Sequence, residues 1–298
     1  MKWTVLAAFA ALSCSRPEAA APPAGIDSPT ARSLLGAVPD YAFSVRIDRL
    51  RADPIYAAII HDAAADESFR ALFESVGAVD AVGAIGETSF EKGSFIGVLR
   101  GPPPLEKLPA DWRKSIEEGG AARKLPSGIF EFASISKKGW PYGFYASDQW
   151  WVLLAGYAAG PGHDWFSNHT TAPPPVEFGG DVLAGFWLGG HAMKKPVMAK
   201  AAREPGSAGL EGLTLVLRDG AHGDVIYTGV YATSADAENA MNAAGKELGQ
   251  YASVWKSLRD RCPGLSGLAM HGERSGRTVR IRITHVPEGI RAALSCKW

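Results

Sequence analysis

The sequence of 298 residues is poor in cysteine and has no excess of charge of either sign. Its three cysteines include no C-x-x-C pair, so neither a disulfide-rich scaffold nor a zinc-ribbon or thioredoxin-type site is expected. The 31 basic residues balance the 31 acidic residues, which argues against a nucleic-acid partner held by net charge. With 21% charged and 46% hydrophobic residues, the composition is that of an ordinary folded protein with one large domain or two smaller ones.

Motifs for nucleotide and hydrolase chemistry are also missing. The chain has 34 glycines, yet neither G-x-G-x-x-G nor G-x-x-x-x-G-K occurs, and there is no G-x-S-x-G nucleophile elbow. Among the seven histidines only His163 and His169 are close in sequence, and their spacing differs from the i, i+4 pair of a zinc-binding helix. We therefore predict no enzymatic activity, no metal site and no cofactor.

The N-terminus has the features of a signal peptide. Lys2 precedes eleven uncharged residues, Trp3 to Ser13. This stretch is shorter than the about 20 residues of a membrane-spanning helix, and it fits the apolar region of a signal peptide. It ends in Ala11-Leu12-Ser13-Cys14. This ending predicts cleavage before Cys14. The alternatives are cleavage after Ala19-Ala20-Ala21, as in a simple secreted protein, and an uncleaved N-terminus in a cytoplasmic protein.

The tetrapeptide that ends in Cys14 resembles the lipobox of bacterial lipoproteins, in which the cysteine is acylated and becomes the first residue of the mature chain. It differs in having Ala11 where that family prefers leucine. By the sorting rule of some Gram-negative bacteria, Ser15 in place of aspartate implies the outer membrane. If Cys14 is lipidated, Cys262 and Cys296 remain as an even pair in an oxidising compartment, which predicts a disulfide between them, with two buried thiols as the alternative.

The rest of the chain alternates strands and helices in an order that repeats. Tyr41 to Asp48 alternates apolar and polar residues, as in a half-buried strand with Ser44 and Arg46 facing outward. An Ala-rich helix is expected from Asp53 to Val76. A segment rich in proline and glycine, Thr170 to Asp181, separates two halves that both follow the order strand, helix, two strands, helix, strands, helix. We interpret this order as a diverged internal duplication.

The predicted fold class is α+β. Each half would be a ferredoxin-like repeat, with helices packed on one face of an antiparallel sheet. The predicted divisions are a signal peptide at 1–13, the lipidated cysteine and a flexible tether at 14–38, a first repeat at 39–169, a linker at 170–181 and a second repeat at 182–298.

The opening of the first repeat reads Tyr-Ala-Phe-Ser-Val-Arg-Ile-Asp-Arg-Leu-Arg-Ala-Asp-Pro-Ile-Tyr. This opening, the lipobox and the order of elements together look like a loose set of uncharacterised Gram-negative bacterial lipoproteins with two such repeats. The resemblance implies an envelope protein held to the membrane by its lipid, and it brings no assigned activity.

Aromatic residues are concentrated between residues 130 and 187. Trp150 and Trp151 are adjacent in a predicted strand and so point to opposite faces, which means that one of them must leave the core of a one-sided sheet. We take Trp140, Trp150 and Trp165 as the candidate surface for an apolar ligand or a protein partner. Packing of these rings in the core is the alternative.

Two further patterns allow a structural and a binding interpretation. Apolar residues recur at spacings of four and three in an expected helix, 234–259, which predicts docking on its own sheet or a dimer contact. Arg277, Arg280 and Arg282 lie near or on the outward side of the last predicted strand. They are a candidate contact for anionic glycan or lipid headgroups, with a solvated sheet face as the alternative.

The sequence thus predicts a membrane-anchored envelope lipoprotein with a non-catalytic binding or scaffolding role, whose partner is an envelope protein or an apolar ligand. The main alternative is a carrier or chaperone that holds an apolar ligand in an aromatic cleft. An envelope hydrolase is a further alternative, and it would need a serine or aspartate within hydrogen-bond reach of a histidine in a pocket. A closed cavity lined by the three tryptophans would favour the carrier, and a filled core would favour the scaffold.

Overall fold

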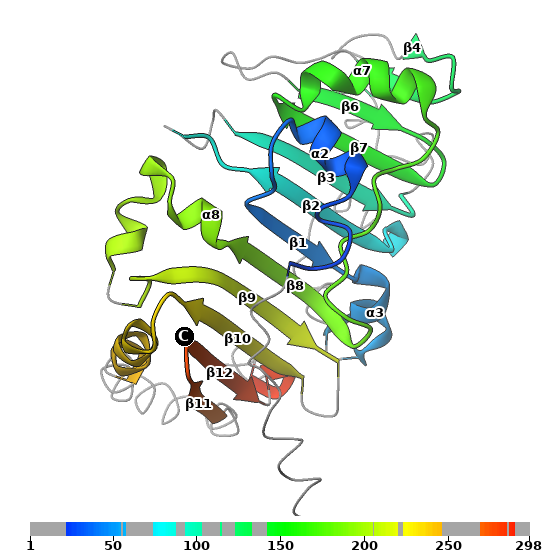
Figure 1. Cartoon of the computed structure of the whole chain (residues 1–298). Coiled ribbons are helices and arrows are strands. Elements are labelled where there is room, and N and C mark those ends of the chain that lie inside the picture. The colour runs from blue at the N-terminus through cyan, green and yellow to red at the C-terminus, as the bar shows by residue number, and fades with distance from the viewer. Residues whose placement is uncertain are drawn as a thin grey trace, which may run out of the picture.

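The structure is a computed structural model, and it describes residues 22–54, 56–57, 74–87, 93–102, 114, 123–132, 142–204, 206–219, 223–245, 269–284 and 286–289. Within these ranges the chain is an α+β protein in which the strands form one antiparallel sheet and a few helices pack against it (Figure 1). In chain order the strands are β1 (Tyr41–Val45), β2 (Ala78–Ala84), β3 (Ser94–Arg100), β4 (Arg123–Lys124), β5 (Phe130–Phe132), β6 (Tyr142–Ala146), β7 (Trp150–Gly156), β8 (Val182–Gly189), β9 (Leu210–Arg218), β10 (Asp224–Tyr231), β11 (Ala269–Ser275) and β12 (Thr278–Thr284).

Strands β1 and β8 lie side by side within the sheet and join the two halves of the chain. The strand order is β11-β12-β10-β9-β8-β1-β2-β3-β7-β6-β5-β4. In the β1–β8 pair, Phe43 lies opposite Phe186. Going outward from this pair, the order β1-β2-β3-β7-β6 on one side matches the order β8-β9-β10-β12-β11 on the other. The two halves therefore arrange corresponding strands in the same order within one sheet.

The sheet does not show ferredoxin-like units. In a split βαβ unit the two strands joined by the helix are parallel and are separated in the sheet by a third strand, whereas here β1 pairs directly with β2 and β8 pairs directly with β9, both antiparallel. In each half the first three strands follow one another as neighbours in the sheet. The α+β class is thus correct, and the finer ferredoxin-like assignment is not what the strand order shows.

Helix α2 (Pro29–Leu35) lies in the stretch predicted as tether, and its ends carry local start and stop signals. The Oγ of Ser28 accepts a hydrogen bond from the N–H of Ala31 at 3.1 Å, and proline occupies the first turn. The helix ends at Gly36, whose φ of 63° is left-handed. Leu34 and Leu35 are buried in the core, so the folded body begins before residue 38 and any tether is shorter than predicted.

Three further helices with both ends in the described residues are α3 (Ile47–Ala52), α7 (Ala159–Asn168) and α8 (Gly190–Met193), and 3-10 turns lie at Pro196–Met198 and Ala201–Arg203. A single α-helix does not continue from α8 through residue 202, because Pro196 lacks the N–H that an α-helix needs at that position. The chain therefore leaves α8 after Met193 and continues in 3-10 turns.

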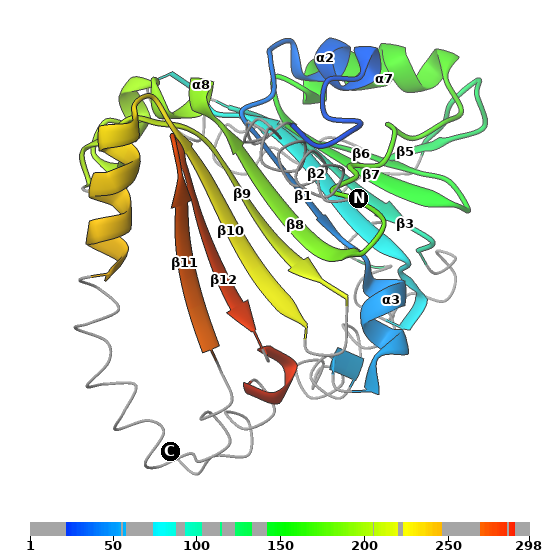
Figure 2. The same cartoon turned by 60° about the horizontal axis from the view of Figure 1, so that its bottom comes forward.

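Both faces of the sheet are covered. Trp187 packs with α2 and α7 in one core cluster, whereas its neighbour Leu188 packs with α8 in another. Adjacent residues of a strand point to opposite faces, so these clusters lie on opposite sides. Figure 2 shows α2 and α7 together on one side of the strands β2, β3, β6 and β7. The helices that pack on the first half and those that pack on the second half therefore lie on opposite faces of the shared sheet.

The described part of the helix predicted at 234–259 docks on its own sheet. Residues 234–245 are helical, and Ala237, Ala240 and Met241 pack in the cluster that contains Tyr231 and Val279. The predicted helices at Asp53–Val76 and 105–118 lie largely outside the described residues.

Candidate functional site

The aromatic-rich segment is packed into the core where the structure describes it. Trp150 and Trp151 point to opposite faces as predicted, but their exposed fractions are only 6% and 4% because each face of the sheet is covered at β7. Trp150 packs on Phe166 of α7 at a ring-centroid distance of 5.4 Å, and Trp151 packs edge-on against Phe144. The expectation that one of the two tryptophans leaves the core is wrong.

Of the other two candidate tryptophans, the structure describes only Trp165. Trp140 lies outside the described residues. Trp165 is partly buried against the core and stacks on the His169 ring at 3.8 Å, with 4° between the rings. Its Nε1 is buried without a hydrogen-bond partner among the described residues. The two described candidates, Trp150 and Trp165, therefore belong to the same packed core cluster, and the prediction for Trp140 is not tested.

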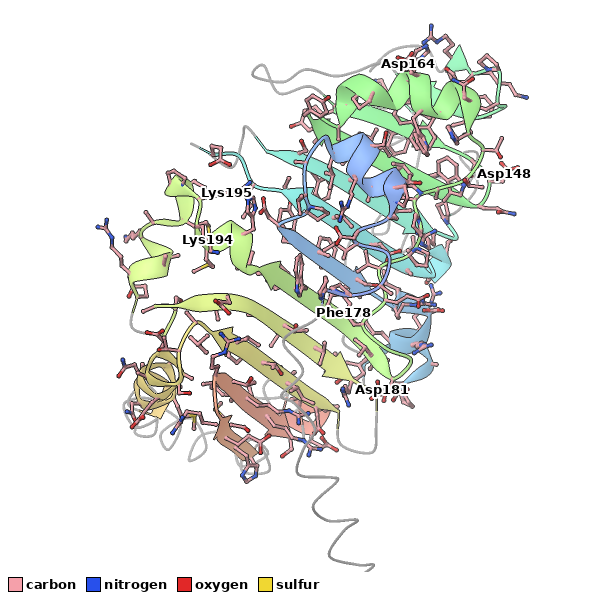
Figure 3. All side chains as sticks on the ribbon, viewed as in Figure 1. Asp148, Asp164, Phe178, Asp181, Lys194 and Lys195 are labelled. Carbon is pink, nitrogen blue, oxygen red and sulfur yellow. The ribbon has the colours of Figure 1, made fainter. Side chains whose placement is uncertain are left out.

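A pocket lies at the end of the β1–β8 pair, on the face that carries α2 and α7. It has a volume of about 180 Å³. It lies between the end of β1, α3 and the chain that leads into β8. Its lining residues are Ser44, Arg46, Arg49, Val176, Glu177, Phe178, Gly179, Gly180 and Val182. Figure 3 shows Phe178 and Asp181 toward this end of the pair and Lys195 at the opposite end.

Local sequence explains how the pocket is built. The predicted strand Tyr41–Asp48 ends at Val45, and the chain turns into α3 with Arg46 as its N-cap residue. On the other side Phe178 lies over Gly185, where a β-carbon would meet its ring at 2.4 Å. Only glycine at 185 lets this ring lie flat on β8. The ring forms the apolar wall of the pocket together with Val176 and Val182.

Two arginines give the pocket its donors. Arg49 donates from Nη1 to the carbonyl of Gly180, and Nη2 of Arg46 lies 3.5 Å from Oδ2 of Asp48. Among the described residues, the buried Nε–H of Arg46 has no hydrogen-bond partner. A buried donor without an acceptor costs free energy, so this group is an explicit gap in the hydrogen bonding of the pocket.

A buried charge cluster lies at the opposite end of the β1–β8 pair. The Asp40 carboxylate is fully buried and accepts from Lys195 Nζ at 2.7 Å and from the N–H of Ile85 at 2.7 Å. Its other oxygen lies 2.8 Å from Nδ1 of the exposed His191. Lys195 is also buried, donates to the carbonyl of Ile85 and lies 3.7 Å from the exposed Glu87. The cluster ties β1 and β2 to the segment after α8.

A second polar group links β4, β5, β6 and α7. Glu131 forms an ion pair with Arg123 at 2.5 Å, and His163 Nδ1 lies 2.9 Å from the same carboxylate. The Tyr145 hydroxyl donates to Glu131 at 3.2 Å. Burial alone would raise the pKa of Glu131, but the hydrogen bonds and charges of Arg123 and His163 outweigh burial and lower it. Burial and the nearby Glu131 raise the pKa of Tyr145.

The lowered pKa of Glu131 predicts a defined dependence of stability on pH. A carboxyl group whose folded pKa lies below its unfolded value stabilises the fold above the unfolded value of about 4.3, and this contribution disappears as pH falls through the folded pKa. Glu131→Gln should therefore lower the free energy of unfolding at pH 7 by on the order of 1 kcal/mol. The difference from the unmodified chain should shrink below about pH 4.

Urea unfolding of both proteins between pH 7 and pH 3 measures this effect. Glu273→Gln is the matched control, because Glu273 is 72% exposed and lies 3.7 Å from Arg280. Parallel pH profiles for the unmodified chain and Glu131→Gln would contradict the assignment.

The predicted basic surface is not free. Among the described residues, each of the three candidate arginines on or near β12 has an acidic partner. Arg277 lies 3.3 Å from Glu211, Arg280 lies 3.7 Å from Glu273, and Arg282 pairs with Asp224. This pairing favours the solvated-face interpretation over a headgroup contact.

Several candidate residues lie outside the described residues or form no site within them. Cys14, Cys262 and Cys296 fall outside the described ranges, so the lipid anchor and the disulfide stay predictions. His163 and His169 are not brought together, since one faces Glu131 and the other stacks on Trp165. Among the described residues, no group of three or more histidine, cysteine, aspartate or glutamate side chains could hold a metal ion. No described helix is both long and apolar enough to span a membrane.

The sequence pattern missed the residues that the structure brings together. Ser44 and Arg46 were assigned to the solvent side of a strand, whereas their face is covered and forms part of the pocket. Nothing in the sequence around Lys195 reveals a partner as distant in sequence as Asp40.

The described chain is thus an α+β protein with one antiparallel sheet, in which some neighbouring strands are not consecutive in sequence. It has a pocket lined by two arginines and a buried Asp–Lys pair. No protein-family model and no curated protein matches it. Among solved structures it is similar to crystal form I of TP0453, with 12% sequence identity and a TM-score of 0.41. The match covers 88% of this chain and 96% of that chain.

Proposed function

We propose that the protein is a lipoprotein of the bacterial cell envelope, held to the outer membrane through acylated Cys14, with a non-catalytic binding or scaffolding role. The support for the anchor is the short apolar leader that ends in Ala11-Leu12-Ser13-Cys14. With lipid chains attached to a single residue, only that residue is held in the bilayer and the folded domain stays in the aqueous part of the envelope. Its partner is an envelope protein or a small ligand.

The observation that carries the binding or scaffolding role is the filled core around Trp150. The rings of Trp150, Tyr145 and Phe166 are all buried, and Tyr145 stacks on Phe166 at 4.5 Å. Aromatic residues packed in this way stabilise a sheet and leave no aromatic cleft at that position. The matching strand order around the β1–β8 pair supports two diverged α+β repeats that form one continuous platform.

The two alternatives have less support. A carrier needs an apolar cavity, and the described pocket is lined by polar residues as well as by Phe178. A hydrolase needs a serine or aspartate within hydrogen-bond reach of a histidine in a pocket. Asp40 does lie beside His191, but neither residue lines the described pocket, and the His163 ring contacts Glu131 and Arg123 among the described residues.

Cys14→Ala tests the anchor. In a Gram-negative host, the unmodified protein should sediment with the membrane fraction and enter the detergent phase on partitioning. The alanine variant should lose both properties, because no lipid can be attached. Cys262→Ala is the matched control and should stay in the membrane fraction, since its predicted role is a disulfide with Cys296.

Release of both cysteine variants to the same extent would contradict lipidation of Cys14. Retention of Cys14→Ala in the membrane fraction would contradict it equally.

A further inference from the structure

We propose that β11 is an interaction surface for a second copy of this chain, and that the two β11 strands pair antiparallel around Gly272 when the protein is on the membrane. This inference names a partner for the proposed binding or scaffolding role and rests on that role. It has three supports: an open sheet edge, side chains that match their own copies in one register, and a short connection to the anchor.

The two edges of the sheet differ. Figure 1 shows β4 and β11 at opposite ends of the strand order. β4 has only two residues, Arg123 and Lys124, and a short edge strand with exposed cations resists pairing with another chain. β11 has seven residues, and those from Met270 to Ser275 are all exposed. Among the described residues no strand pairs with the outer side of β11, so its outward N–H and C=O groups can pair with a further strand.

The side chains of β11 alternate between the two faces of the sheet. His271 and Glu273 lie opposite Arg282 and Arg280 of β12 on one face, and Gly272 lies on the other face. When two copies of one strand pair antiparallel, a two-fold axis perpendicular to the sheet relates them. Residues opposite each other then point to the same face. His271 must therefore lie opposite a residue of its own face, which leaves few possible registers.

Charge selects one of these registers. A pair centred on Glu273 would bring two carboxylates together, and a pair centred on His271 would bring two histidines together, and like charges directly opposite are destabilising. In the pair centred on Gly272, His271 of each copy lies opposite Glu273 of the other, and all seven residues are paired. An imidazole N–H donates to a carboxylate in either protonation state. On the other face Met270, which is 38% exposed, would be covered by the Arg274 stem of the second copy.

The proposed anchor holds the copies close together. The folded body begins near Ala24, whose N–H donates to the Glu177 carbonyl at 3.1 Å and whose carbonyl accepts from the Glu177 N–H at 3.0 Å. Ala24 is ten residues from Cys14, so it stays within about 35 Å of the acylated residue in any conformation of the chain between them. Confinement to this layer raises the effective concentration of each copy for the other, as a linker does for two binding sites. An edge contact that is weak in solution is therefore favoured on the membrane.

Disulfide cross-linking of the full-length, acylated protein in phosphatidylcholine vesicles tests the register. Two variants, His271→Cys and Glu273→Cys, are purified with different tags, mixed in the same vesicles and oxidised. In the proposed register the two cysteines are directly opposite, with a Cα distance of about 4.5 to 5.5 Å that a disulfide can bridge. Cysteines at the same position of both copies are diagonal neighbours, about 7 Å apart or more, which a disulfide does not bridge. We therefore expect cross-linked dimers in the mixture and few in either variant alone.

Two controls accompany this experiment. Lys124→Cys mixed with Glu273→Cys should give no more dimer than either variant alone, because Lys124 lies on the opposite edge of the sheet. The unmodified chain measures cross-linking through the native cysteines. A mixture of His271→Cys and Glu273→Cys that gives no more dimer than these controls would overturn the contact. Equal yields from the mixture and from each variant alone would overturn the register.

Charge variants show whether the two cross-strand pairs are responsible. The fraction of dimers is counted by photobleaching of fluorescently tagged protein on a supported bilayer, and urea unfolding checks that each variant is folded. His271→Glu places two carboxylates opposite each other at both pairs and should weaken dimerisation about tenfold. The double variant His271→Glu with Glu273→Lys sets opposite charges against each other again and should restore the dimer. Lys124→Glu is the matched control and should dimerise as the unmodified protein does.

Each other result overturns the proposal or a named part of it. Equal dimer fractions for His271→Glu and Lys124→Glu, or a double variant no better than His271→Glu, would overturn recognition through these pairs. Failure of the strand pairing leaves acylation of Cys14 unaffected. If the chain carries no lipid, the mixed cysteine variants are oxidised in solution at high protein concentration. Cross-linking there supports the pairing and overturns only the anchor, and its absence there overturns the pairing as well.

Discussion

Replacing Lys195 by methionine is expected to lower the free energy of unfolding by about 3 to 5 kcal/mol. The ammonium group lies 2.7 Å from Oδ2 of Asp40, and both side chains are buried. Two charges in this environment have lost their hydration, and each is stabilised mainly by the other. Removal of the lysine leaves the Asp40 carboxylate in the core with the Ile85 N–H and His191 as its remaining partners among the described residues.

A double-mutant cycle with Asp40→Asn and Lys195→Met, followed by urea unfolding, separates this coupling from lost packing. The double variant should be less destabilised than the sum of the two single variants, because no buried charge remains without its partner. His191→Gln is the matched control. His191 is 62% exposed, so its loss should cost less than about 1 kcal/mol. A cost of that small size for Lys195→Met would contradict the buried pair.

Trp150→Ala is expected to destabilise the protein by about 3 to 5 kcal/mol, the cost typical of a large core aromatic residue. Trp150 is 6% exposed and contacts Phe166, so its removal leaves a cavity between β7 and α7. Thermal and urea unfolding measure the effect. If Trp150 instead lined an open ligand cleft, its removal would change ligand binding with little loss of stability.

The matched control for Trp150→Ala is Tyr157→Ala. Tyr157 follows the same strand but is 64% exposed, so its replacement should change the free energy of unfolding by no more than about 1 kcal/mol. Equal effects of the two variants would contradict the packed aromatic core and would return support to the carrier.

Local pattern was sufficient to predict most of the strands. The alternation in Tyr41–Asp48 gave the start of β1, and the two strands expected after the first helix correspond to β2 and β3. These predictions hold because the period of two in a strand is a property of neighbouring residues. The class, α+β with antiparallel strands, follows from the same patterns.

The pairing of segments that are distant in sequence could not be predicted from local sequence patterns. The two halves form one sheet because β1 pairs antiparallel with β8. The sequence of neither strand identifies the strand with which it pairs. The assumption of a one-sided sheet then led to the wrong expectation for Trp150 and Trp151. Coverage of the second face is a tertiary property, and it decides whether both members of an adjacent pair are buried.

The same limit applies to the candidate site. His191 and Asp40 are 151 residues apart in sequence, and the pocket combines Arg46 and Arg49 with residues 176–182. Composition directed attention to tryptophans because they are rare and large. The polar groups of the pocket and of the buried pair belong to arginine, aspartate and lysine residues, whose positions carry no distinctive spacing.

The most direct measurement of the proposed function is the intact mass of the protein purified from membranes of a Gram-negative host, together with the mass of its N-terminal peptide. A lipoprotein should begin at Cys14 and carry the added mass of acyl chains on that residue. A chain that begins at Met1, or a mature chain with a free thiol at Cys14, would contradict the anchor and the envelope role proposed from it.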